Sequence, residues 1–229
     1  MEFIFMLTHN DRTVDNALEV LEAVKDTGLT QIGFKDVGAT AERQKELAAA
    51  AHAAGMTVYL EIVSIDKEDE LASVDAAIAA GVDWIVGGKF AAEAAERLAG
   101  TGIKFAPFPG QVVGHPSILQ GTIEEIAEHA ARLVAAEGVD GVDLLAYRHA
   151  GVDPLELTRA VADAIGDAPV IAAGSVVSQE QIEGLTEAGA WGFTIGGAIF
   201  DGALPGEKDV VSQVRTALEF ATTAAAAAK

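Results

Sequence analysis

The chain has 229 residues, half of them hydrophobic, and its fifteen basic and thirty-five acidic residues give a net charge of −20. This composition is typical of a soluble globular protein with a sizeable core. So acidic a chain repels nucleic acid and anionic membrane surfaces, and we expect neither as a partner. The absence of cysteine excludes disulfides, thiolate nucleophiles and cysteine-ligated metals. The apolar N-terminal run is short and carries Glu2 in place of a basic flank, so we expect neither a signal peptide nor a membrane span, and a cytoplasmic location.

Short apolar runs alternate with segments of helical periodicity. The apolar runs cover residues 2–9, 31–37, 57–64, 84–88, 104–110, 142–149, 169–175 and 192–200. Near-continuous runs of this kind are typical of parallel strands covered on both faces. The intervening segments carry helix-start signals, such as the capping-box spacing of Thr122 and Glu125 and the Asp153-Pro154 pair. Glycines follow many of these segments, as expected at helix C-termini.

Eight such strands and eight helices predict an α/β fold, a single (β/α)8 TIM barrel that occupies residues 1–229. The competing fold, a doubly wound open sheet, usually carries a glycine fingerprint after its first strand. The corresponding turn here reads THNDRT and contains no glycine. The Ala-rich tail 221–229 is expected to continue the last helix and then to lose its apolar stripe.

The active site of a TIM barrel lies at the carboxyl ends of the strands. The last two strands end in small residues, at Gly174 and Ser175 and at Gly196 and Gly197, and a short extra helix is expected over 197–200. Backbone N–H groups at such turns can bind a phosphate dianion, because no β-carbon keeps the anion away from the backbone. The alternative is that these glycines only turn the chain.

The stretches PVIAAGSV and WGFTIGGAIF, together with the strand and helix count, resemble the phosphate-binding TIM barrels. That group includes ribulose-phosphate epimerases, isomerases of histidine and tryptophan synthesis and sugar-acid-phosphate aldolases. The resemblance implies that Gly174, Ser175, Gly196 and Gly197 hold a ligand phosphate. It does not select a reaction, because the D-x-K-x-x-D decarboxylase motif and the His and Asp metal set of the epimerases are missing.

The apolar stretch GFKDVG, residues 33–38, contains two charged residues, Lys35 and Asp36. Strand residues alternate between faces, so Lys35 and Asp36 lie on opposite faces, and Lys35 becomes a cross-strand neighbour of Glu61 if both point into the barrel. A lysine there can form a Schiff base or, kept charged by Glu61, polarise a carbonyl oxygen while the carboxylate moves a proton. Asp36 is expected to serve the scaffold. The alternative for Lys35 and Glu61 is a structural ion pair.

Further polar residues are expected at the same end of the barrel. His9 is a candidate acid or base, and His115 belongs to a Pro- and Gly-rich loop, 107–121, that is expected to form an ordered lid. One of Tyr147 and Arg148 should face inward, and Arg148 could clamp a second anionic group of the substrate. The histidines have no close metal-ligand spacing; His9, His115 and His149 could still converge, but we expect no metal.

These observations favour a cofactor-independent enzyme for a small phosphorylated carbonyl compound, of the isomerase or epimerase type. In this hypothesis Lys35 is the electrophile, Glu61 is the base or acid, and His9 or His115 supplies a second acid or base. The alternatives are a class I aldolase with Lys35 as its Schiff-base nucleophile, and a non-catalytic barrel that binds a phosphorylated metabolite. The Ala-rich helices expected over 41–54 and 91–99 are candidate contact surfaces for a homo-oligomer.

Overall fold

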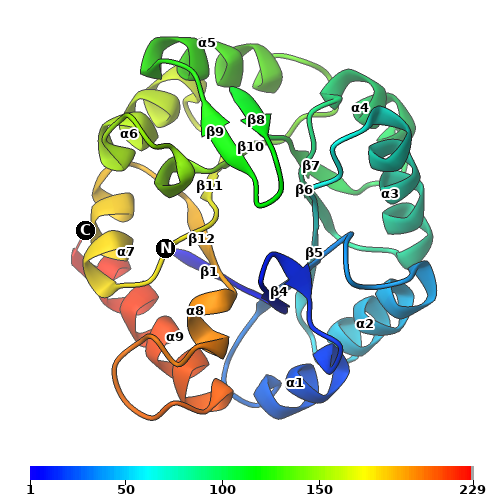
Figure 1. Cartoon of the computed structure of the whole chain (residues 1–229), viewed down its shortest axis with the longest axis vertical. Coiled ribbons are helices and arrows are strands. Elements are labelled where there is room, and N and C mark those ends of the chain that lie inside the picture. The colour runs from blue at the N-terminus through cyan, green and yellow to red at the C-terminus, as the bar shows by residue number, and fades with distance from the viewer. Residues whose placement is uncertain (228–229) are drawn as a thin grey trace.

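The computed structural model describes residues 1–227. One sheet of eight parallel strands forms a barrel, and helices surround it (Figure 1). The strands are β1 (Glu2–Met6), β4 (Gln31–Lys35), β5 (Thr57–Ile62), β6 (Trp84–Gly87), β7 (Lys104–Ala106), β10 (Val142–Leu144), β11 (Val170–Ala172) and β12 (Gly192–Ile195). Each lies within one of the eight apolar runs, so the predicted single (β/α)8 barrel is confirmed.

The barrel closes between β7 and β10 without a regular ladder. The hydrogen-bonded strand order runs β10-β11-β12-β1-β4-β5-β6-β7, which leaves these two strands at the ends of the sheet. Single backbone bonds join them: the N–H groups of Asp140 and Gly141 donate to the carbonyl of Phe105, and Asp143 donates to Pro107. We refer to this junction as the seam.

The helices form the outer layer. They are α1 (Ala17–Val24), α2 (Ala41–Ala53), α3 (Lys67–Ala80), α4 (Ala91–Leu98), α5 (Ile123–Val134), α6 (Pro154–Ile165), α7 (Gln179–Glu187), α8 (Gly197–Phe200) and α9 (Val210–Ala227). The predicted starts are confirmed: Thr122 and Glu125 form a capping box, and Asp153 caps α6 with Pro154 in its first turn. Between α4 and α5 lies a groove of about 990 Å³ lined largely by alanines and other apolar residues.

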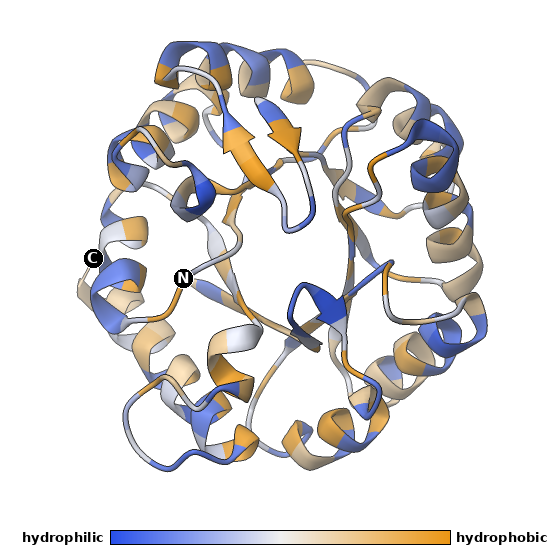
Figure 2. Ribbon diagram, in the orientation of Figure 1, coloured by the Kyte–Doolittle hydropathy of each residue, from blue (hydrophilic) through white to orange (hydrophobic). Residues whose placement is uncertain are grey.

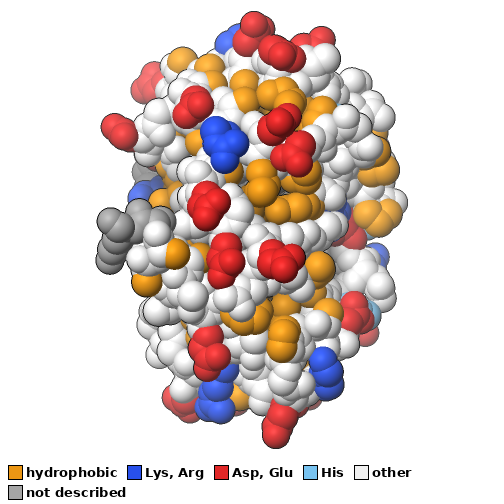
Figure 3. All heavy atoms as spheres, turned by 90° about the vertical axis from the view of Figure 1, so that its left-hand side faces the viewer, with side chains coloured by type: hydrophobic (Ala, Val, Ile, Leu, Met, Phe, Trp, Pro, Cys, Tyr) orange, Lys and Arg blue, Asp and Glu red, His pale blue; other side chains and the backbone are white. Residues whose placement is uncertain are grey.

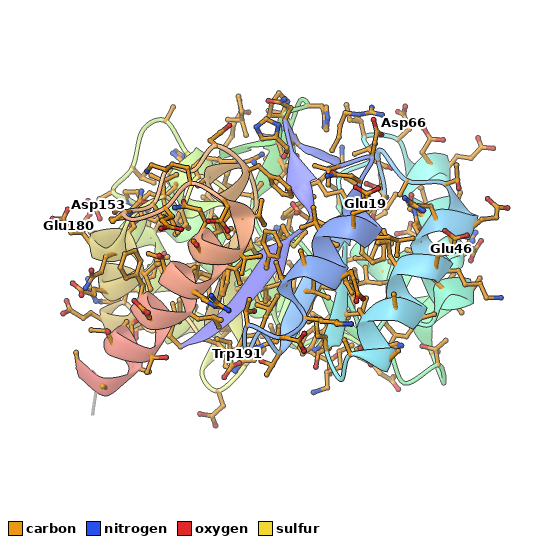
Figure 4. The ribbon with its side chains drawn as sticks, turned by 90° about the horizontal axis from the view of Figure 1, so that it is seen from below. Glu19, Glu46, Asp66, Asp153, Glu180 and Trp191 are labelled. Carbon is orange, nitrogen blue, oxygen red and sulfur yellow. The ribbon has the colours of Figure 1, made fainter. Side chains whose placement is uncertain are left out.

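The core has an inner and an outer part. Phe3 and Phe5 on β1 pack outward against helix residues, whereas Ile4 and Met6 belong to a small cluster inside the barrel. At the amino ends of the strands Tyr59, Trp84 and Trp191 stack. Figure 4 shows Trp191 at that end and Asp66, which follows β5, at the opposite end. The carboxyl ends therefore form the other mouth of the barrel.

Two hairpins that we did not predict project over this mouth in Figure 1. The first joins β2 (Thr8–His9) to β3 (Arg12–Thr13), and the second joins β8 (Gln111–Val113) to β9 (Ile118–Gln120). In Figure 2 the β2–β3 hairpin is largely hydrophilic, while β8 and β9 are hydrophobic. The strands of both hairpins are only two or three residues long, too short for a periodic pattern to predict them from the sequence.

Two expectations need correction. The run 142–149 is not one strand, because β10 ends at Leu144 and Ala146–Arg148 form a 3-10 helix. The tail keeps its apolar stripe as far as α9 extends, since Ala221 and Ala224 are buried there. The rest of the expected tail, residues 228–229, lies outside the described residues.

The surface agrees with the composition. Acidic side chains predominate over basic ones on the face shown in Figure 3, where they alternate with hydrophobic side chains. Within residues 1–227, every helix is too short or too polar to cross a lipid bilayer.

Candidate active site

A cavity of about 450 Å³ opens at the carboxyl ends of the strands. Its walls come from two sides of the barrel. One side carries the charged residues of the first strands, and the other carries the small residues that follow β11 and β12. The lining includes Thr8, His9, Asn10, Asp11, Lys35, Glu61, Arg148, Gly174, Ser175, Val176, Gly196, Gly197, Ala198 and Asp201. The volume suits a small metabolite.

The predicted pairing of Lys35 with Glu61 is present. The two residues are directly opposite in the β4–β5 register, and Lys35 Nζ lies 3.3 Å from Glu61 Oε1. Both side chains are buried. Thr13 fixes the end of β4, because its hydroxyl both accepts from the N–H of Lys35 and donates to its carbonyl, each at 2.9 Å. The ammonium group is thereby held over the interior of the barrel.

Asp11 is the residue of this cluster to which sequence reasoning assigned no role. It lies at the tip of the β2–β3 hairpin, where Asn10 and Asp11 both adopt left-handed backbone conformations, with φ of 49° and 61°. Its Oδ1 accepts from Lys35 Nζ at 2.5 Å and from Arg148 Nη2 at 3.0 Å, and its Oδ2 accepts from Arg148 Nη1 at 3.3 Å. The pair Asn10-Asp11 between two short polar segments is a turn signal, and the hairpin could have been predicted from it.

The cluster holds Asp11 and Lys35 in their charged forms. Burial alone would raise the pKa of Asp11, but hydrogen bonds from Arg148 and the charge of Lys35 outweigh it and hold that pKa well below its usual range. Burial likewise disfavours the ammonium of Lys35, but the carboxylates of Glu61 and Asp11 outweigh burial and raise the pKa of Lys35. Lys35 is therefore a cation and not a free amine at neutral pH.

Asp36 serves the scaffold, as its position on the strand predicts. Its carboxylate accepts from the backbone N–H of Val63 and from the hydroxyls of Ser64 and Ser73. These bonds tie the end of β4 to the end of β5 and to α3. The pleat thus separates the two neighbouring charges, Lys35 toward the cavity and Asp36 away from it.

On the β10 side, Arg148 reaches the cavity and Tyr147 does not. Tyr147 packs against the hydrophobic core and does not line the cavity. One of the two residues was expected to face inward, and this residue is Arg148, although the chain leaves the extended conformation after Leu144. The guanidinium of Arg148 is already paired with Asp11, which argues against the expected clamp for a second anionic group.

Asp143 lies deep inside the barrel below this cluster. Its side chain is fully buried, and within residues 1–227 neither carboxylate oxygen has a hydrogen-bond partner. Burial, reinforced by the negative charge of Glu61, raises the pKa of Asp143 well above its usual range. This carboxyl group therefore keeps its proton to higher pH than an exposed aspartate does.

The three histidines occupy different places. His9 lines the cavity, and its Nε2 lies 2.8 Å from Asp201 Oδ1. His115, near the tip of the β8–β9 hairpin that forms part of the expected lid, places Nδ1 3.7 Å from Asp11 Oδ2. His149 instead bonds the carbonyl of Gly121 at 2.9 Å. Among the residues described, no group of three or more histidines and carboxylates has the geometry of a metal site.

The glycine turns line the opposite wall, although two of their glycines are required by protein neighbours. A β-carbon on Gly174 would lie 2.2 Å from Arg148 Nε, and one on Gly196 would lie 2.4 Å from Thr8 Oγ1. One on Gly197 would meet nothing closer than His9 at 4.0 Å. Within residues 1–227 the backbone N–H groups of Gly174, Ser175, Gly197 and Ala198 have no protein acceptor. These groups are free to bind a ligand.

Comparison with known proteins agrees with the fold. No family model matches the chain. Over 73 residues, 32% of this chain, the sequence is 47% identical to an imidazole-4-carboxamide isomerase of Methanothrix thermoacetophila whose name contains two phosphoribosyl groups. The match spans 26% of that relative's length.

Solved structures that are similar over almost the whole chain include two enzymes of Pyrococcus species. Orotidine 5'-phosphate decarboxylase from Pyrococcus horikoshii has a TM-score of 0.66, covers 96% of this chain and 99% of its own, and is 14% identical. N-(5'-phosphoribosyl)anthranilate isomerase from Pyrococcus furiosus has a TM-score of 0.64, covers 97% and 99%, and is 16% identical. The chain thus shares the (β/α)8-barrel fold of enzymes named for phosphorylated compounds. The predicted resemblance to phosphate-binding barrels is confirmed at the level of the fold.

Proposed function

We propose that this protein is an enzyme that moves a proton at the carbon next to the carbonyl group of a small phosphorylated compound, as an isomerase or epimerase does. The observation that carries the proposal is the buried pair of Lys35 and Glu61 at one end of a metabolite-sized cavity. Such a pair supplies a base and a fixed positive charge to the same reacting centre. The proposed roles need only side chains of this chain.

In the proposed reaction Glu61 removes a proton from the carbon next to the carbonyl. The resulting enolate oxygen is stabilised by the ammonium of Lys35, which burial makes more effective than it would be in water. The proton then returns to the neighbouring carbon or oxygen in an isomerisation, or to the opposite face in an epimerisation. His9 lines the cavity and is the candidate for the second proton transfer, while His115 lies beside Asp11.

A phosphate at the other end of the substrate would be held by the turns after β11 and β12. The free N–H groups of Gly174, Ser175 and Gly197 support this placement, because backbone donors bind phosphate oxygens without a cationic side chain. The cation sites at the reacting end are occupied by carboxylates, so the two ends of the cavity differ in the group each can receive. This distinction orients the substrate.

The class I aldolase alternative requires Lys35 as a neutral amine. The raised pKa of Lys35 disfavours that form, because Glu61 and Asp11 stabilise the ammonium. A borohydride experiment separates the two reactions. Incubation with aldose and ketose phosphates followed by borohydride and intact-mass measurement should leave the chain unmodified. A stable adduct on Lys35 would establish the aldolase reaction in place of proton transfer.

The direct test is exchange of the substrate proton with solvent. The protein is incubated in D2O with a panel of aldose and ketose phosphates, and deuterium incorporation is followed by proton NMR. Glu61→Gln should lower the exchange rate about 10²- to 10⁴-fold and leave ligand-induced thermal stabilisation in place. Glu46→Gln, an exposed position on α2 that points outward in Figure 4, is the matched control and should change neither.

The third alternative, a non-catalytic binder of a phosphorylated metabolite, has its own signature in this experiment. It requires that ligands raise the melting temperature of the wild-type protein while none of them exchanges a proton or is converted. Absence of both stabilisation and exchange across the panel would contradict the phosphate site itself.

A further inference from the structure

Four charged side chains at the reacting end of the cavity satisfy one another. The exposed fractions of the side chains are 4% for Lys35, 5% for Asp11, 6% for Glu61 and 20% for Arg148. Lys35 contacts both carboxylates, and Arg148 donates two hydrogen bonds to Asp11. Asp143, buried below them, makes no hydrogen bond to any of the four within residues 1–227. The two cations and two carboxylates of this cluster therefore balance one another.

Asp11 is placed in this cluster by the turn of the β2–β3 hairpin. Both residues of the hairpin tip, Asn10 and Asp11, adopt the left-handed conformation, which asparagine and aspartate tolerate better than other non-glycine residues. The other hairpin also approaches Asp11, through His115 Nδ1 at 3.7 Å. Ser117, in the same hairpin, presents its carbonyl to Arg148. A buried carboxylate that contacts Lys35, Arg148 and His115 at once indicates a role for the carboxylate itself.

We infer that the reacting end of the substrate is uncharged, bearing only carbonyl and hydroxyl groups, and that Asp11 is the residue that determines this specificity. The inference rests on the proposed function. A carboxylate or a second phosphate at this end would meet Asp11 and Glu61 in a buried site where both cations are already paired. Bringing an anion there leaves a buried charge uncompensated, which is strongly unfavourable.

A substrate with an uncharged reacting end can bind without breaking the ion pairs of this cluster. When Glu61 takes a proton it becomes neutral, and the enolate carries the single negative charge that Glu61 lost. Lys35 contacts two negative charges before the transfer, on Asp11 and Glu61, and two after it, on Asp11 and the enolate. The total charge of the cluster and substrate is conserved in this step. An acidic substrate would produce a dianion at this end, where both cations of the cluster are already paired.

The test compares two ligands with the same five-carbon chain, a pentitol 5-phosphate and the corresponding pentitol 1,5-bisphosphate, by isothermal titration calorimetry. Inorganic phosphate is titrated as a probe of the phosphate site alone. Ionic strength is kept at about 0.2 M so that the overall negative charge is screened beyond about 8 Å. The monophosphate should bind the wild-type protein at least about tenfold more tightly than the bisphosphate.

Asp11→Asn keeps the size of the side chain and removes its charge, which frees Arg148 and leaves Lys35 paired with Glu61 alone. This variant should bind the bisphosphate at least about tenfold more tightly than the wild type does, and the monophosphate nearly unchanged. Asp201→Asn is the control, since Asp201 also lines the cavity but is exposed and makes no contact with Lys35 or Arg148. It should change both affinities by the same factor.

The outcomes separate this inference from the proposed function. If none of the three ligands binds, the phosphate site and the proposed function fail. If they bind and the wild type accepts the bisphosphate as tightly as the monophosphate, the neutral reacting end is wrong and the phosphate site stands. The wild-type comparison decides this even if Asp11→Asn fails to fold. An equal gain in bisphosphate affinity in Asp201→Asn and Asp11→Asn would overturn the specific role of Asp11.

Discussion

The buried carboxyl group of Asp143 makes the free energy of unfolding depend on pH. Its pKa is raised in the folded protein, so the folded state retains a proton that the unfolded chain releases above the ordinary value of 3.8. For a group of this sign, the stability contribution is complete below the unfolded pKa and is lost as pH rises toward and through the folded pKa. Asp143 therefore lowers stability progressively above about pH 4.

Replacement of Asp143 by asparagine should remove this dependence. The free energy of unfolding of Asp143→Asn, relative to wild type, should increase as pH rises from about 4, by up to about 1.4 kcal/mol per pH unit. Urea denaturation at several pH values between about 4 and 8 measures it. Asp163→Asn, at an exposed position on α6, should show no such trend. A pH-independent difference for Asp143→Asn would mean that Asp143 titrates like an exposed carboxyl.

The residues of the cluster differ in how far the sequence predicts them. Lys35 and Glu61 are predictable because strand alternation and parallel register are local rules, and both hold to the last residue of β4. Asp11 is not predictable in this way, because its position depends on a tight turn that folds back over the barrel. Tyr147 and Arg148 were treated as strand residues, and the change to a 3-10 helix removed the basis for assigning their faces.

At the scale of elements, the β2–β3 hairpin depends on close contact with the loop after β4. Thr13 N donates to the carbonyl of Val37 at 3.0 Å, and Thr13 also bonds both backbone groups of Lys35. Gly38 packs against β3 so closely that a β-carbon on Gly38 would lie 2.6 Å from the carbonyl oxygen of Thr13. The second glycine of GFKDVG thus makes room for the hairpin that carries Asp11.

Gly38→Ala should displace the hairpin and lower stability. Gly38 has a φ of +95° and no room for a methyl group, whereas Gly28 has a φ of +91° and nothing within 4 Å of a β-carbon. Gly28→Ala therefore measures the cost of the backbone conformation alone, about 1–2 kcal/mol. Gly38→Ala should cost at least about 1 kcal/mol more, as overpacking does, and should also impair proton exchange. Urea denaturation and the exchange assay measure both effects; equal costs would contradict the tight packing.

The helices were more predictable than the hairpins. Their starts depend on short capping signals such as Thr122 with Glu125, and these signals act within one turn of helix. The β8–β9 hairpin lies in a loop rich in proline and glycine, where composition indicates order without specifying strand pairing. Pairing of Val112 with Leu119 is a contact between positions seven apart that no periodic pattern marks.

For the molecule as a whole, the seam between β7 and β10 is the weakest part of the barrel wall. Strands β4 and β5 pair through a continuous register, whereas the seam depends on separate bonds from Asp140, Gly141 and Asp143. The groove between α4 and α5 lies outside the same region, so this part of the wall has less cover. Local opening should therefore begin here.

Amide hydrogen exchange can test this expectation. The N–H groups of Gly141 and Asp143 should exchange at least about tenfold faster than that of Leu60 in the β4–β5–β6 part of the sheet. Exchange followed by NMR under native conditions gives the rates residue by residue. Equal protection at the two places would mean that the barrel opens only by global unfolding.

The two hairpins at the mouth have a consequence for how such a protein can change. Each hairpin leaves the barrel wall and returns to it a few residues later. The tip of the β2–β3 hairpin carries Asp11, whose carboxylate pairs with Lys35 and Arg148. Variation at the two tips would alter which compounds are accepted while the wall, the helices and the Lys35–Glu61 pair are inherited unchanged. A library randomised at positions 10–11 and 114–117 would sample new ligand preferences while the barrel and the proposed catalytic pair are preserved.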